Sequence, residues 1–169
     1  TDELNKPELS YPLTVYLCKD CGLVQLGFIV PASELYNEHY AYESSTTKNR
    51  RENHNQLAEY ICSTFNIKND SLVVDVGSNV GVLLDGFKRQ GMKVIGVDAS
   101  SNIVKKANKN GIETILGFFN NDITKKIIDN SGRASVVTAT NLFAHIQNYH
   151  QFIIDLKQLL EPNGIFVFQ

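Results

Sequence analysis

The strongest constraint on the fold is an alternation of sequence patterns that begins after Asp70. Short runs rich in valine and isoleucine recur there, separated by amphipathic stretches of about ten residues. The runs are Leu72–Val76, Lys93–Asp98, Glu113–Leu116, Ser135–Ala139 and Ile165–Phe168, and helices are expected near 80–90, 100–110, 121–130 and 148–160. Strands that are apolar on both faces and alternate with helices form parallel sheets covered on both sides. The sequence therefore predicts an α/β fold with a Rossmann-like parallel sheet and flanking helices.

The first 45 residues follow a different pattern, with prolines at positions 7, 12 and 31 and only short apolar runs. They predict a small ribbon and a linker, which divides the chain into a segment 1–45 and a main domain 46–169. A helix is expected next, because the residues 44–47 offer N-caps before an apolar periodicity. The chain has no initiator methionine and stops in a predicted strand. We expect a piece of a longer protein, with its main domain truncated at the C-terminus.

Composition narrows the classes of partner. Hydrophobic residues make up 43% of the chain and charged residues 20%, which is enough for one proper core. The net charge of -2, without a dense run of lysine and arginine, argues against nucleic acid and anionic membranes as partners. No apolar stretch approaches the roughly 20 residues that span a bilayer, and no signal peptide is recognisable. A cytoplasmic protein with a small-molecule substrate is expected, and the oligomeric state is left open.

A pair of cysteines marks the N-terminal segment. Cys18 and Cys21 are separated by two residues and lie between apolar runs. This spacing is typical of a zinc knuckle, in which two thiolates supply half of a tetrahedral site. A thioredoxin-type redox pair would lie at a helix N-terminus, whereas the residues 22–26 read as a strand. We expect Cys18 and Cys21 to be ligands of a structural zinc, in a site that is incomplete because four ligands are required. Either the partner pair lies upstream of Thr1, or the site is empty here.

A glycine-containing loop follows the first predicted strand, where an open parallel sheet binds nucleotide-like ligands. The loop reads Asp75-Val76-Gly77-Ser78-Asn79-Val80-Gly81, and the second strand ends at Asp98, an acid placed to accept hydrogen bonds from ribose hydroxyls. A dinucleotide fingerprint would need glycine where Asn79 and Val82 stand. An acidic Asp75 also suits a cationic amino group better than a diphosphate. The loop therefore predicts a site for adenosine joined to an amino-acid tail.

This loop resembles the first motif of class I S-adenosylmethionine-dependent methyltransferases, in the variant D-x-G-S-N-x-G. The resemblance implies that Asp75, Gly77, Ser78, Asn79 and Gly81 surround the methionine part of S-adenosylmethionine. It implies that Asp98 holds the ribose, that Ala99, Gly117 and Phe118 border the adenine, and that Asn141 belongs to the same site. The alternative is a structural glycine turn with a solvated aspartate. On their own, the aromatic residues after Gly117 are more typical of a core.

The catalytic candidates lie in two other segments. His145 follows the fourth predicted strand, whose carboxyl end borders the site in this fold. A neutral imidazole there can remove a proton from a carbon next to a carbonyl, and the resulting enolate can displace a methyl group from sulfonium. A helix-capping or merely hydrogen-bonded histidine is the alternative. Tyr40 and Tyr42 could close over the cofactor and donate a hydrogen bond to the substrate, or could serve only in packing.

The order of these motifs resembles the sugar C-methyltransferase family. Such proteins combine an N-terminal zinc-binding domain, a methyltransferase core and a C-terminal domain. The resemblance implies methylation of a carbon beside the keto group of a nucleotide-linked deoxysugar. The first pair of zinc ligands and the later strands of the family are absent, so we expect cofactor binding with little or no turnover. A small-molecule O- or N-methyltransferase and a non-catalytic nucleotide-binding interaction domain are the alternative interpretations.

Overall fold

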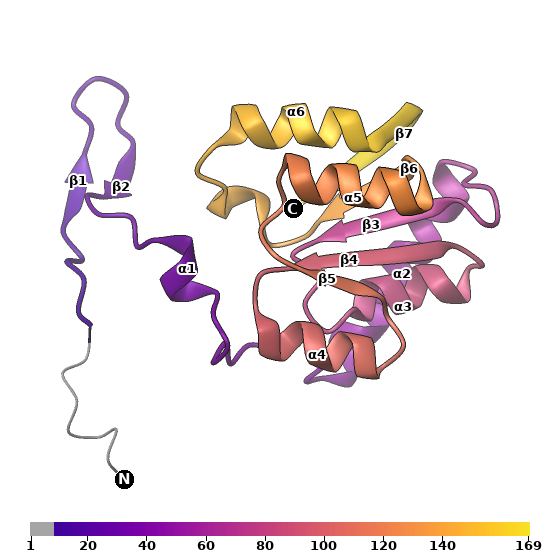
Figure 1. The fold of residues 1–169 in the computed structure, drawn as a ribbon. Helices are drawn as coiled ribbons and strands as arrows, with labels where there is room; N and C mark the ends of the chain where they lie inside the picture. The colour runs from indigo at the N-terminus through magenta and orange to yellow at the C-terminus, as the bar shows by residue number, and fades with distance from the viewer. Residues whose placement is uncertain (1–8) are drawn as a thin grey trace, which may run out of the picture. The chain divides into compact units, whose positions relative to one another are not determined.

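The computed structural model describes residues 9–169, and the chain divides into two compact units (Figure 1). The first unit ends at Leu35, and the second runs from Tyr36 to Gln169. This division falls earlier than the boundary predicted after residue 45, because Tyr40 and Ser44 form hydrogen bonds within the second unit. In the described part of the chain, no helix has the length and apolar character that a membrane crossing requires.

The first unit contains the predicted ribbon. Strands β1 (Val15–Leu17) and β2 (Val24–Leu26) pair in antiparallel register, with Val15 opposite Leu26, and the short helix α1 (Ala32–Leu35) follows. Residues 18–23 form the turn that connects the two strands. In it the N–H of Cys18 donates to the Leu23 carbonyl at 2.8 Å, and Gly22 adopts a φ of 74°. This turn brings Cys18 and Cys21 to one end of the ribbon.

The second unit is built on a five-stranded parallel sheet with the order β5-β4-β3-β6-β7. The strands are β3 (Leu72–Val76), β4 (Lys93–Asp98), β5 (Thr114–Leu116), β6 (Ala134–Ala139) and β7 (Leu160–Phe168). All five predicted strands are confirmed. β7 begins earlier than predicted because Leu160 already pairs with Ala134, ahead of a register irregularity in β6. The predicted Rossmann-like fold is therefore confirmed.

Helices cover both faces of this sheet (Figure 1). The helices are α2 (Lys48–Thr64), α3 (Val82–Arg89), α4 (Ser101–Lys109), α5 (Asn121–Ser131) and α6 (Tyr149–Leu159). Successive residues of a strand point to opposite faces. Val73 accordingly packs in the cluster formed with α2 and α3, and Val74 packs in the cluster formed with α5 and α6. One layer of apolar side chains on each face thus holds the helices against the sheet. The loops that bear the predicted site residues follow the carboxyl ends of the strands.

Candidate functional site

The loop between β3 and α3 is held by the neighbouring strand. The N–H groups of Gly77 and Ser78 donate to the Val97 carbonyl, at 2.8 and 3.2 Å. Gly77, Asn79 and Gly81 all adopt positive φ, at 74°, 51° and 83°. A side chain at Gly81 would also collide with Ile112, whose Cγ2 atom would lie 2.7 Å from the added Cβ. The glycines therefore allow a turn that keeps the loop backbone beside the end of β4.

Asp98 stands at the tip of β4, next to this loop. One carboxylate oxygen accepts the N–H of Asn79 and the other accepts the N–H of Ser100, each at 2.9 Å. Burial raises the pKa of Asp98, and these two backbone N–H groups act against that rise. A carboxylate has about four lone-pair sites, so each oxygen keeps acceptor capacity. The two acceptor oxygens of Asp98 thus fit the two hydroxyl donors of a ribose.

Asp75 lies deeper, on β3, with only 3% of its surface exposed. Its carboxyl accepts a hydrogen bond from the Thr138 hydroxyl at 2.6 Å, across the β3–β6 pairing. Burial raises the pKa of Asp75 to about 7, the Thr138 bond opposes this, and the negative charge of Asp98 adds to the rise. A cationic amino group nearby would favour the ionised form. The position of Asp75 near a methionine tail stays a prediction.

The side chains of Ser78 and Asn79 are both buried but differ in their hydrogen bonds. The Ser78 hydroxyl is buried without a hydrogen-bond partner, and a Cβ added to Gly96 of β4 would lie 2.4 Å from it. The Asn79 amide is bonded to the segment before α2, to Tyr42 and Ser44. The Asn79 side chain is therefore fully used within the protein, whereas the Ser78 hydroxyl has no partner among the described residues.

The segment Tyr40–Ser44, which we call the strap, crosses the glycine loop and α4. The Ser44 N–H donates to the Asn79 side-chain oxygen at 2.9 Å, and the Asn102 amide donates to the Tyr40 carbonyl at 2.8 Å. The Tyr40 ring packs against the cluster of Val80, Val82 and Ile103. The sequence did not predict these bonds, because Ser44 was expected as one of several N-cap candidates. Thr47 is the N-cap of α2 instead.

The two candidate tyrosines differ in environment. Tyr40 lies between Tyr36 and Tyr42, with ring centroids 5.4 and 6.5 Å away, and burial raises its pKa. Tyr42 is 46% exposed. Arg50 of α2 donates to the Tyr42 hydroxyl oxygen and holds its guanidinium carbon 5.2 Å from the ring centroid. Tyr42 thus keeps its own hydroxyl proton available to donate.

The tip of β5 lies beside Asp98. The N–H of Gly117 donates to the Asp98 carbonyl at 2.9 Å, and Gly117 adopts a φ of 148°. Phe118 is 45% exposed, whereas Phe119 packs edge-on against Phe152 at 5.2 Å. Only one of the two aromatic residues therefore belongs to the core. Phe118 is exposed and Ala99 is half-buried, and their role at the adenine stays a prediction.

The segment after β6 returns over the glycine loop. Asn141 adopts a φ of 55°, and Leu142 lies close enough to Gly77 that an added Cβ would meet its Cδ2 atom at 3.2 Å. His145 ends the 3-10 helix η2 (Phe143–His145) and is exposed. Asn148 caps α6 by accepting the N–H of Gln151. The alternative role of His145 as the cap of this helix therefore does not hold.

The cysteine pair has the surroundings expected of a knuckle. Cys18 and Cys21 are free thiols, and strand β2, rather than a helix, follows them. Hydrogen bonds from the backbone of Cys21 and Asp20, and then from the Cys21 thiol, lower the pKa of Cys18. Two thiolates fit two positions of a tetrahedral zinc site. Within residues 9–169 no group of three metal-ligating side chains is assembled, so these residues do not complete the site.

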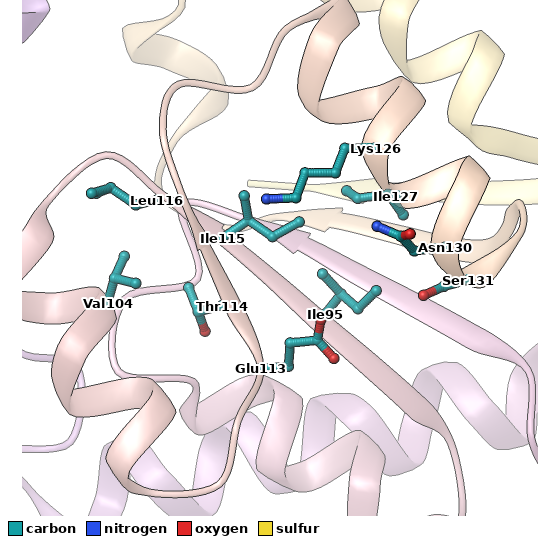
Figure 2. Close-up of a pocket in the computed structure, with 10 residues that line it drawn as sticks. All are labelled: Ile95, Val104, Glu113, Thr114, Ile115, Leu116, Lys126, Ile127, Asn130 and Ser131. Carbon is teal, nitrogen blue, oxygen red and sulfur yellow. The ribbon is translucent and has the colours of Figure 1, made fainter.

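A separate hollow of about 350 Å³ lies along the edge strand β5, between α4 and α5. Figure 2 shows Lys126 and Asn130 projecting from α5 beside Ile115 of the strand. None of the predicted cofactor or catalytic residues lines it. The glycine loop and Asp98 are therefore not part of this hollow.

Comparison with known proteins agrees with this geometry. The family described as "Methyltransferase domain" matches residues 37–169, and the family described as "Putative zinc binding domain" matches residues 1–36. C-methyltransferase NovU of Streptomyces niveus is 31% identical over 159 residues, which cover 94% of this chain and 38% of NovU. Ubiquinone biosynthesis O-methyltransferase of Pasteurella multocida is 29% identical over 120 residues, covering 64% of this chain and 50% of that protein.

Among solved structures, a methyltransferase of Thiobacillus denitrificans in complex with S-adenosyl-L-homocysteine shares the fold. Its TM-score is 0.51 at 20% identity, with coverage of 67% of this chain and 47% of that one. This chain thus spans half or less of the length of each of these proteins. Because the matching family model covers most of the chain, from residue 37 to its end, the chain belongs to the methyltransferase domain family.

Proposed function

We propose that the chain is the S-adenosylmethionine-binding core of a methyltransferase that acts on a carbon of a nucleotide-linked keto-deoxysugar. The observation that carries the proposal is the Asp98 carboxylate, fixed by two backbone N–H groups and still able to accept ribose hydroxyls beside the glycine loop. The similarity to C-methyltransferase NovU over 94% of the chain supports carbon as the methyl acceptor. The order of the sequence motifs, which resembles that of the sugar C-methyltransferase family, supports a sugar as the methyl acceptor.

In this proposal, each group of site residues has a separate task. S-adenosylmethionine supplies an electrophilic methyl group on a sulfonium. Asp98 binds the ribose, while Ala99, Gly117 and Phe118 border the adenine. The loop backbone and Asn141 line the methionine tail, and the Asp75 carboxylate offers the amino group a negative charge. Cys18 and Cys21 hold a structural zinc together with ligands from elsewhere.

The chemical step needs a base close to the substrate. His145 is exposed on η2, directly after the loop that contacts Gly77, so its imidazole is accessible to a substrate at the carboxyl edge of the sheet. It takes a proton from the carbon beside the keto group, and the enolate carbon then bonds to the methyl group while the sulfonium becomes a thioether. Tyr42, whose hydroxyl oxygen already accepts from Arg50, donates its proton in a hydrogen bond to a substrate oxygen.

Cofactor binding is tested with Asp98→Ala. We expect this variant to bind S-adenosylhomocysteine at least about tenfold more weakly in calorimetry, because each hydrogen bond to a charged group contributes about 1.5–3 kcal/mol. Asp129→Ala, which removes an exposed carboxylate from α5, is the matched control and should bind like the parent. Equal affinity of the Asp98→Ala variant would remove the ribose assignment.

Methyl transfer to carbon is tested in the natural gene product that contains this chain, with an isotope-labelled methyl donor and a nucleotide-linked ketosugar. We expect the label on carbon. His145→Ala should lower the rate by about 10²–10⁴-fold, the usual contribution of general acid–base catalysis, without changing S-adenosylhomocysteine affinity. His150→Ala, on the exposed start of α6, should retain activity. NMR of the product shows which atom carries the label.

A second candidate function, O-methylation of a small molecule, is favoured by one observation. Several ubiquinone biosynthesis O-methyltransferases match more than half of this chain at 27–30% identity. In the same experiment, a label on oxygen, with activity unaffected by His145→Ala, would contradict the C-methyltransferase proposal and support this alternative.

A further inference from the structure

The Asn79 side chain uses both of its polar atoms within the protein. Its oxygen accepts the Ser44 N–H at 2.9 Å, the Ser44 hydroxyl at 3.3 Å and the Val80 N–H at 2.9 Å. Its nitrogen donates to the Tyr42 carbonyl at 3.0 Å. Asn79 and Ser44 are each only 8% exposed. This buried amide therefore joins two segments that are 35 residues apart in the sequence.

The backbone of Asn79 contacts the other half of the site. Its N–H donates to the Asp98 carboxylate at 2.9 Å, on the acid proposed to hold the ribose. One residue thus connects the tip of β4, through its backbone, with the strap, through its side chain. Two further contacts tie the strap to α4, namely the bond from Asn102 to the Tyr40 carbonyl and the ion pair of Glu43 with Lys106.

We propose that Asn79 is a positioning residue, which locks the strap against the glycine loop and so fixes Tyr40 and Tyr42 relative to the cofactor and substrate. This inference rests on the proposed function and deepens it. Asparagine is suited to the task because the position needs a φ of 51°, which few side chains tolerate, and an amide that both donates and accepts. Glycine would keep the backbone but lose the amide. Aspartate would keep an acceptor but lose the donor to Tyr42.

The first test measures the strap directly, in this chain, by hydrogen exchange of the Ser44 amide. In Asn79→Gly this amide should exchange at least about tenfold faster, since its acceptor and the strap's link to Tyr42 are both lost. Asn66→Gly is the matched control, because Asn66 has the same φ of 51° but is exposed after α2. It should leave Ser44 exchange unchanged. Unchanged exchange in Asn79→Gly would overturn the proposal.

The second test separates positioning from cofactor binding, in the natural gene product. We expect Asn79→Gly and Asn79→Asp to lower kcat for methyl transfer by about tenfold or more, because misplaced groups lose catalytic alignment. S-adenosylhomocysteine affinity should change less than about threefold in Asn79→Gly, whose backbone N–H to Asp98 remains. If the Ser44 amide of Asn79→Gly exchanges faster but kcat is unchanged, the positioning role is overturned. A label found on oxygen would contradict only the C-methyltransferase proposal, because the exchange result is independent of the acceptor.

Discussion

Every residue of strands β1 and β2 is exposed, whereas every residue of strand β3 is buried. All of these strands are rich in apolar residues, but the sheet unit covers its strands with helices on both faces, and the ribbon has no such layer among residues 9–35. Domains too small to bury a core usually depend on metals, disulfides or partners. The sheet unit therefore draws its stability from packing, whereas the ribbon is expected to depend on zinc held by the cysteine pair together with further ligands.

The two units also differ in how they respond to protons. In the sheet unit, burial raises the pKa of Asp75 to about 7, so its ionised form is disfavoured by folding. In the ribbon, hydrogen bonds lower the pKa of Cys18, which favours the thiolate that binds metal. Rising pH therefore lowers the folding stability of the sheet unit through Asp75. In the ribbon it increases the fraction of Cys18 that is thiolate, the form that binds metal. Substitutions at these two residues test the contrast.

The largest effect is expected for Asp75→Asn. Between pH 4 and pH 7, roughly the range between the unfolded and folded pKa values of Asp75, the folded protein binds more protons at this residue than the unfolded chain. Stability of the parent should therefore fall across this window and level off above it. The neutral amide removes that slope. At pH 8 the variant should be more stable by as much as about 4 kcal/mol, since one pKa unit corresponds to about 1.4 kcal/mol.

The measurement is urea unfolding followed by circular dichroism from pH 5 to pH 8. Asp129→Asn, on the exposed face of α5, is the control and should show no pH-dependent difference from the parent. A stability difference between Asp75→Asn and the parent that stays constant with pH, or that grows toward acid, would show that burial does not disfavour the Asp75 carboxylate.

The contrast between the units also explains which structural features can be predicted from the sequence alone. The sheet strands were predictable because buried parallel strands require continuous apolar runs, and the glycine loop because positive φ at Gly77 and Gly81 requires glycine. The strap was not predictable. It depends on hydrogen bonds between Ser44 and Asn79, and between Tyr40 and Asn102, and a polar residue carries no sequence signal for a partner so far away. The asparagine in the middle of the loop indicates only that a polar amide stands there, and not which segment the amide binds.

The directions of individual side chains in the loop also cannot be predicted from the sequence. Motif resemblance identifies Ser78 as a cofactor residue but does not reveal that its hydroxyl faces Gly96, because only the twist of the turn decides that direction. Whether the predicted residues contact the cofactor stays a prediction, for which Asp98→Ala is the most direct test.

The smallest effect on the sheet unit is expected for Cys18→Ser. Cys18 lies in the turn of the ribbon, so its substitution should move the Tm of the sheet unit by no more than about 2 °C, as for most surface changes. Cys62→Ser is the matched comparison. Cys62 packs on the core cluster of α2 and α3, where burial raises its pKa, so a hydroxyl there should lower the Tm by about 5 °C.

Alkylation of the parent by iodoacetamide, followed by mass spectrometry, checks the ribbon side of the comparison. Cys18 should react faster than Cys62 near neutral pH, because its lowered pKa supplies more thiolate. In the natural gene product that contains this chain, zinc added before the reagent should slow the reaction at Cys18 and leave Cys62 unaffected, since a bound thiolate is no longer a free nucleophile. Faster reaction at Cys62 in the metal-free protein would contradict the lowered pKa of Cys18, and a Cys18 rate that zinc leaves unchanged would contradict the assignment of the ribbon as the metal-binding unit. If Cys18→Ser lowered the Tm of the sheet unit as much as Cys62→Ser does, the stability of the sheet unit would depend on the ribbon.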